Sequence, residues 1–255
     1  MAYSCDETKN KKLLCIFVCI NNIMKLTSIT LILIAFLSFS LTQSSTDDCK
    51  SYYPLEQGIK MTYEQFDKKN KLTGTTTTFV KSVNSLGTNT EYVLEVSGVS
   101  AKPKKDEVPF KKEFTYVCTD GVLSFDMSSF VPKETLAAFG NQPVELEQSE
   151  IVLPKSLEVG QKLNDGYVKL IMGGVDFMTV NIINRTVEKM ETITTEAGTY
   201  NCALITSETN MVMSFMSIKS TSKEWYSTEV GMVKSETYDK KGKLTGSQKL
   251  KAYSK

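Results

Sequence analysis

"FDKKNKLTGT", Phe66–Thr75, and "YDKKGKLTGS", Tyr238–Ser247, place nearly the same ten residues near both ends of the chain's second part. In each copy an Asp follows an aromatic residue, and Asp side chains accept hydrogen bonds from backbone amides two residues further on, which starts a turn. Asn70 and Gly242 occupy the same place in the two copies, and both residue types tolerate a positive φ. We therefore predict one β-hairpin used twice, with its lysines in water.

The spacing of the two copies predicts the architecture. An early and a late hairpin of like geometry are expected to lie side by side, which brings the two ends of one antiparallel sheet together. Curving such a sheet avoids long exposed edges. Gly74 and Gly246, at matching positions after the turns, are expected to mark a bulge or a close backbone approach.

The rest of the sequence after residue 49 alternates with the period of two that is typical of strands. The predicted fold is all-β: a single antiparallel, strongly curved sheet forming an open or half barrel, with one short helix at Pro132–Phe139. Strand patterns separated by turn residues cover the following stretches: Met61–Phe66, Thr73–Val83, Thr90–Gly98, Pro109–Cys118, Val122–Met127, Tyr167–Met172, Asp176–Met190, Tyr200–Leu204, Asn210–Ser220 and Glu224–Tyr238.

Residues 1–45 are expected to lie outside the fold. The stretch from Met24 has a basic start, an apolar core and small residues after it, the layout of a secretory signal peptide. We predict that Met24 is the true start, with residues 1–23 an upstream extension; a longer basic region of the same signal and a membrane anchor are the alternatives. Residues 46–255 form a single all-β domain, exported to the periplasm or to an extracellular or outer-membrane-associated position.

Composition narrows the classes of function. The sequence has no histidine, which excludes His-based catalytic triads and His metal ligands. The net charge of +1 argues against nucleic-acid binding and predicts at most transient membrane contact. We assign no catalytic, cofactor-binding or metal-binding residue and expect a protein that is not an enzyme; its oligomeric state is open.

Three cysteines, Cys49, Cys118 and Cys202, follow the leader. An oxidising compartment permits one disulfide among them, and three pairings are possible. We favour Cys49 with Cys118, which ties the start of the domain to the end of a strand; buried, unpaired thiols are the alternative.

A methionine-rich stretch is the candidate binding site. Methionine adapts to irregular apolar shapes, which suits a cavity for an apolar ligand inside a curved sheet. Ordinary core packing is the alternative interpretation. The candidate cavity residues are Met178, Met211, Met213, Phe215, Trp225 and Tyr226.

A lysine-rich segment, Ala101–Glu113, carries five lysines and two prolines. It is interpreted either as a contact for anionic headgroups or glycans, or as a solvated loop between two strands.

Four stretches together resemble a known family: "CKSYYPLEQGIKMTYEQFDKKNKLTG" from Cys49, "LEVGQKLNDG" from Leu157, "TITTEAGTYNCALI" from Thr192 and "EWYSTEVGMVKSETYDKKGKLTG" from Glu224. They are similar, in order, to exported Gram-negative proteins of the domain-of-unknown-function family 3108, also called TapB-like. The resemblance implies a secreted, all-β, single-domain envelope protein. It implies no reaction and no catalytic residues. Some relatives resemble the curved half-barrels of lipoprotein carriers, an analogy of fold.

Two hypotheses of function follow. The first is a non-enzymatic carrier that binds a lipid or another apolar molecule in the concavity of the sheet. The second is a structural or assembly component of the envelope that binds another protein. A cavity lined by Met and aromatic residues would favour the first, and a filled core with an exposed apolar patch the second. A polar cleft with two carboxylates or a Tyr–Lys pair would favour an enzyme.

Overall fold

The structure, a computed structural model, describes residues 52, 53, 55–131, 144–213 and 216–255. The chain divides into two compact units, Met1–Ser45 and Thr46–Lys255, and every element described below belongs to the second. No helix among these residues is long and apolar enough to cross a membrane. The helix predicted at Pro132–Phe139 lies outside the described residues; within them a single 3-10 turn, Met127–Phe130, is found.

The described residues form one antiparallel sheet of thirteen strands, which confirms the predicted fold class. The strands are β1 (Lys60–Asp67), β2 (Leu72–Leu86), β3 (Asn89–Ser100), β4 (Phe110–Thr119), β5 (Val122–Asp126), β6 (Val144–Gln148), β7 (Glu150–Leu153), β8 (Gly166–Met172), β9 (Val175–Thr195), β10 (Gly198–Met213), β11 (Met216–Ser227), β12 (Gly231–Asp239) and β13 (Leu244–Ser254).

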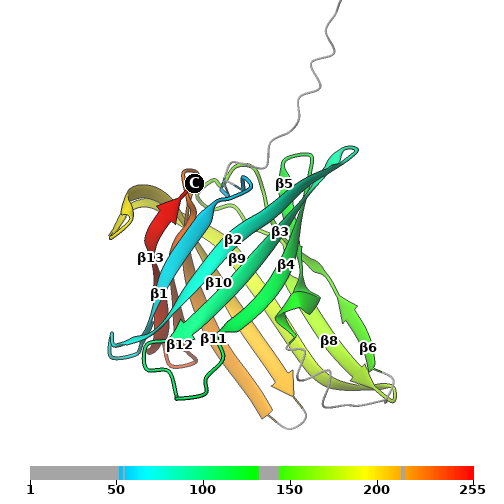
Figure 1. Cartoon of the computed structure of the whole chain (residues 1–255). Helices are drawn as coiled ribbons and strands as arrows, with labels where there is room; N and C mark the ends of the chain where they lie inside the picture. The colour runs from blue at the N-terminus through cyan, green and yellow to red at the C-terminus, as the bar shows by residue number, and fades with distance from the viewer. Residues whose placement is uncertain (1–51, 54, 132–143, 214–215) are drawn as a thin grey trace, which may run out of the picture. The chain divides into compact units, whose positions relative to one another are not determined.

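The first and last strands lie next to each other in the middle of the sheet. The strand order is β6-β8-β9-β10-β11-β12-β13-β1-β2-β3-β4-β5-β7, and β1 pairs with β13 from Lys60 opposite Ser254 to Asp67 opposite Gly246. The two copies of the repeated stretch are therefore neighbours, as predicted. Figure 1 shows the sheet curling so that β1–β4 face β9–β11 across its interior.

The two turns match in detail. The Asp67 Oδ1 atom accepts hydrogen bonds from the amides of Lys69 and Lys71 at 2.8 and 2.9 Å. Asp239 does the same for residues 241 and 243 at 2.8 and 3.0 Å. The φ angles are +58° at Asn70 and +71° at Gly242, as their residue types predict.

The outer strands of the sheet, β6 and β7, are consecutive in sequence, with only Ser149 between them. β6 pairs with β8, whereas β7 pairs with β5 at the other end of the strand order. One extended segment, β6–β7, therefore supplies both edge strands of the sheet. The sheet curls further than a half barrel and is nearly closed.

We call the place where β6 and β7 bring the two edges of the sheet together the seam. There, side chains of Asn164 and Arg185 form hydrogen bonds with the backbone of β7. The Asn164 amide donates to the Glu150 carbonyl at 2.9 Å and accepts from the Val152 amide at 3.2 Å. The Arg185 Nη1 atom donates to the Val152 carbonyl at 3.1 Å. Because these are the bonds that a neighbouring strand would make, the two side chains stand in for a missing strand.

The core is divided between two apolar clusters. The larger cluster takes side chains from most strands and from the Tyr52–Ile59 segment; the smaller one packs around the 3-10 turn and β7–β9. The smaller cluster consists of Met127, Val131, Ile151, Val168, Leu170 and Met178. A cavity that residues of both clusters line remains between them.

Candidate functional site

A chamber of about 320 Å³ lies inside the curled sheet. One side comes from β4, β5 and β7, and the opposite side from the inward-facing residues of β9–β13. A second cavity of about 270 Å³, next to β1–β4, shares walls with the chamber. The residues common to both are Tyr53, Tyr116, Phe125, Met232 and Gln248.

One side of the chamber is aromatic. The rings of Tyr53 and Tyr116 meet edge to face with centroids 5.6 Å apart, and Tyr226 lies 6.4 Å from Tyr53. Burial raises the pKa of each of these three phenols. They therefore remain neutral near pH 7 and offer ring faces together with hydroxyl groups.

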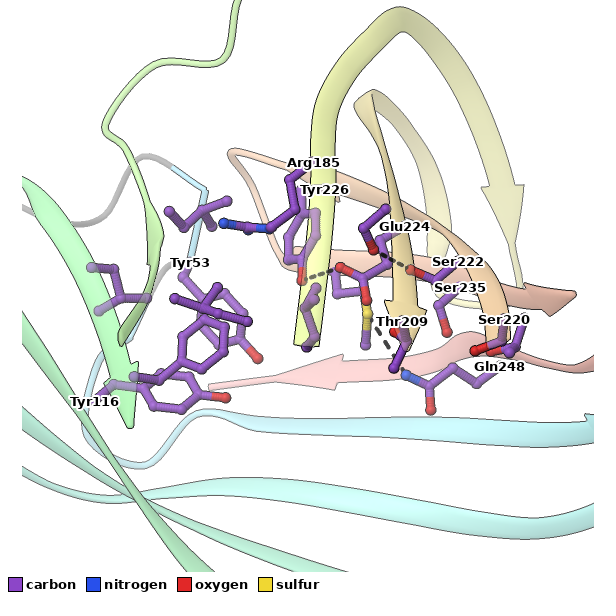
Figure 2. A pocket seen from close by; sticks show the side chains of 18 residues that line it. Tyr53, Tyr116, Arg185, Thr209, Ser220, Ser222, Glu224, Tyr226, Ser235 and Gln248 are labelled. Atoms are coloured by element: carbon purple, nitrogen blue, oxygen red, sulfur yellow. Dashed lines mark hydrogen bonds between the residues drawn. The ribbon is translucent and has the colours of Figure 1, made fainter. Parts of the chain in front are cut away.

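The opposite side is a belt of hydroxyl groups, which Figure 2 shows across the chamber from Tyr53 and Tyr116. The belt is built by register: Ser207 on β10 lies opposite Ser222 on β11, which lies opposite Thr237 on β12. The Ser207 and Ser222 hydroxyls are 2.7 Å apart. We call the following residues the hydroxyl belt: Ser207, Thr209, Ser220, Ser222, Ser235 and Thr237.

Two charged side chains face the chamber, Glu224 and Arg185. Burial raises the pKa of the Glu224 carboxyl, while the hydrogen bond from Tyr226 and the positive charge of Arg185 oppose that rise. The Tyr226 hydroxyl donates to Glu224 Oε2 at 3.0 Å. Glu224 is half-buried, and its side chain lines the chamber.

Arg185 reaches the chamber because β9 is bulged. Asn184 has a φ of +56°, and the pairing of β9 with β10 shifts register at this point. Met178, Val180 and Ile182 belong to the inward-facing set before the bulge, and Arg185 and Val187 are buried after it. The bulge thus turns the sole arginine of the chain from the outer to the inner face.

The chamber opens toward the start of β11. Along the inward face of this strand, Glu224, Ser222 and Ser220 are half-buried, whereas Ile218 is 54% exposed. On β12, Ser235 is half-buried and Thr237 is exposed. Exposure along β11 and β12 therefore increases toward this end of the chamber.

The predicted cavity residues do not gather at one site. Tyr226 lines the chamber. Met178 and Met213 pack in the smaller apolar cluster, and Met211 is half-buried on β10 near its end. Phe215 lies outside the described residues.

Trp225 is turned away from the chamber. Its Nε1 atom donates to the Glu191 carboxylate at 2.7 Å, and the Lys234 ammonium lies 4.3 Å from the centre of its ring. Its neighbour Tyr226 faces inward, because successive residues of a strand point to opposite faces.

The cysteines are placed in part. Cys118 is disulfide-bonded, and Cys202 is a free, buried thiol, so these two are not paired with each other. The predicted partner, Cys49, lies outside the described residues, and the pair stays a prediction. Burial raises the pKa of Cys202 to about 11, which keeps the thiol protonated. Within the described part of the chain, no group of three Cys, Asp or Glu side chains is placed to hold a metal ion.

Comparison with known proteins places the chain in a family. The DUF3108-like family model matches residues 56–250, which include all thirteen strands except the last residues of β13. The chain belongs to the DUF3108-like family. No curated protein sequence matches it.

Two solved structures share the fold of this chain. One is a candidate exported protein with a YmcC-like fold from Bacteroides fragilis NCTC 9343, 22% identical, with a TM-score of 0.61; the match covers 80% of this chain and 99% of that one. The other is a candidate lipoprotein from Parabacteroides distasonis ATCC 8503, 24% identical, with a TM-score of 0.62; the match covers 81% and 100%. At these identities the likeness establishes the fold alone.

Proposed function

We propose that this DUF3108-like chain is an exported, non-enzymatic binding protein that holds a small amphipathic molecule in the chamber. The observation that carries the proposal is the two-sided lining, with tyrosines facing the hydroxyl belt across a space that side chains leave unfilled. Export is supported by the resemblance of the sequence to exported proteins and by the descriptions of the two structural neighbours.

The lining also indicates the class of ligand. The apolar and aromatic side suits a hydrocarbon or ring, and the hydroxyl belt suits a group that both donates and accepts hydrogen bonds. Glu224 and Arg185 have opposite charges, and the described lining residues include no other charged side chain. The chamber therefore favours an uncharged polar group over a carboxylate or an amine.

The alternatives receive less support from the same geometry. An enzyme of the carboxylate type needs a second acid near the first, and Glu224 is the one carboxylate among the described lining residues. A purely structural component would be expected to have a filled interior.

The proposal is tested by native mass spectrometry of the protein purified from its own envelope, followed by thermal shifts with defined amphiphiles. A monoacylglycerol or alkyl glycoside is expected to raise Tm more than a fatty acid or an alkylamine of equal chain length. A ligand at about 100 times its Kd adds about 2.7 kcal/mol to the free energy of unfolding. An apo mass and no Tm shift with any probe would contradict the proposal.

A matched pair of variants locates the binding. Ser222→Leu adds a side chain inside the hydroxyl belt and is expected to abolish the Tm shift. Thr221 precedes Ser222 on β11 and faces outward, so Thr221→Leu is expected to keep the Tm shift. Equal shifts in both variants would place the ligand outside the chamber.

A further inference from the structure

Nine lysines gather where three connections between strands lie next to one another. The β1–β2 and β12–β13 turns are adjacent there, since Asp67 lies opposite Gly246, and the β3–β4 loop joins them through the hydrogen bond from the Ala101 amide to the Thr73 carbonyl. Figure 1 shows these turns together at the lower end. We call this the lysine-rich end; its lysines are Lys68, Lys69, Lys71, Lys102, Lys104, Lys105, Lys240, Lys241 and Lys243.

These nine lysines are all exposed, and no ion pair joins them to a carboxylate within the described residues. The same turns and loop hold four carboxylates, which leaves a local excess of five positive charges in a chain of net charge +1. Three of the four accept hydrogen bonds from turn amides: Asp67, Asp239 and Glu107, the last from the Lys104 amide at 3.0 Å. The exposed ammonium groups therefore outnumber the carboxylates of these turns and this loop, and the cluster is net positive.

Exposed apolar side chains collect at the same end. The β10–β11 strand ends lie there, because Ser220 on β11 is opposite Asp239, and the β8–β9 turn follows, because Met178 is opposite Met213. Among the described residues thirteen large apolar side chains are exposed, and eight lie at this end: Leu72, Val99, Val108, Phe110, Val175, Val212, Met216 and Ile218. Val108 and Val175 are 84% and 69% exposed.

Lysines and exposed apolar side chains at the same end of the sheet suit one surface chemistry in particular. Anionic phospholipid headgroups attract the ammonium groups, while the apolar side chains enter the boundary between headgroups and acyl chains. We propose that the lysine-rich end docks on a membrane surface that carries anionic phospholipids. The chamber opens toward this same end, so docking would present its mouth to the lipid.

The inference does not rest on the proposed ligand, and it is tested by vesicle flotation. The segment Thr46–Lys255 contains every described strand and both apolar clusters as one compact unit, so it is used without residues 1–45, with circular dichroism as the check on folding. It is expected to float with vesicles of phosphatidylcholine mixed with phosphatidylglycerol, less as salt is added, and not with phosphatidylcholine alone.

Two triple variants that each remove three positive charges distinguish binding through the lysine-rich end from attraction by the overall charge of the protein. Replacing Lys240, Lys241 and Lys243 by Gln is expected to weaken binding on the order of a hundredfold, since each lysine near an anionic surface contributes a factor of about five. Replacing Lys60, Lys155 and Lys162, which lie away from this end, by Gln is expected to preserve binding. Equal losses in the two variants would overturn the proposal.

A second pair of variants tests the contribution of the exposed apolar side chains to vesicle binding. Met216→Ser with Ile218→Ser is expected to weaken binding, whereas Leu86→Ser with Val159→Ser, exposed positions away from this end, is expected not to. Absence of flotation, or equal flotation with neutral vesicles, would overturn the proposal. So would binding of polyglutamate without binding of vesicles, which would make this end a site for an acidic protein.

Discussion

Glu224 carries a carboxyl group whose ionisation works against the fold. Unfolded, it loses its proton at its ordinary pKa of about 4.3; folded, burial raises that pKa. Between the two pKa values the folded protein holds more protons than the unfolded one, so this group lowers the free energy of unfolding as pH rises through that window. A carboxyl group with a raised pKa that lines a cavity is a candidate for a functional residue.

Glu224→Gln should remove this pH dependence, because Gln does not titrate. We expect the free energy of unfolding of the native chain, minus that of the variant, to fall as pH rises above about 4.3 and to level off above the raised pKa. Urea unfolding across pH measures it. Glu191→Gln is the control of opposite sign: the Trp225 hydrogen bond lowers the pKa of Glu191, so its stabilising contribution is lost as pH falls. Parallel curves for Glu224→Gln and the native chain would refute the first expectation.

The sequence could have offered one more residue of the site. Arg185 is the single arginine in a chain that otherwise uses lysine, and arginine is the residue type that suits buried polar sites with several hydrogen bonds. Its position inside the chamber could not be predicted, because strict alternation from Met178 through Ile182 puts residue 185 on the outer face. The bulge at Asn184 reverses the alternation, so that Arg185 points to the inner face.

At the scale of elements, the repeated hairpin was predictable because its geometry is local. The Asp side chain, the positive φ and the glycine that follows all act within ten residues. The close backbone approach predicted at Gly74 and Gly246 is confirmed. A Cβ on Gly74 would lie 2.7 Å from the Val99 carbonyl oxygen, and a Cβ on Gly246 would lie 3.3 Å from the Phe66 carbonyl oxygen. The Met-rich strand was harder, since apolar residues on both faces are equally consistent with a cavity, a second core or an exposed end.

The two copies allow a substitution test at the turn. Gly242 has a φ of +71° with open space around its Cα, and Asn70 adopts +58° at the matching position. Gly242→Asn is therefore expected to change the free energy of unfolding by less than about 0.5 kcal/mol. Gly242→Val is expected to cost about 1–2 kcal/mol or more, because a β-branched residue is strained there. Urea unfolding decides, and equal effects of Asn and Val would show that the turn does not hold this φ.

At the scale of the molecule, pairing of the two hairpins follows from the sequence, but closure does not. The switch of partner at Ser149, from β8 to β5, depends on where β5 and β8 lie after the sheet has curled. No pattern within Val144–Leu153 encodes that distance. The chamber exists because of this closure, so its lining residues could not be predicted from the sequence either.

The seam at β7 predicts how closure fails. Asn164→Ala removes the side chain that donates to the Glu150 carbonyl and accepts from the Val152 amide, without touching the strands themselves. Because Asn164 is exposed, we expect a loss of only about 1 kcal/mol in the free energy of unfolding. Hydrogen exchange should nevertheless accelerate at Val152 and along β5–β7, while β12 and β13 keep their protection, since the opening is confined to the seam. Asp165→Ala, which removes the neighbouring side chain, should leave exchange unchanged. Uniform acceleration across all strands would mean that the sheet unfolds as one unit and that the seam is no weaker than the rest.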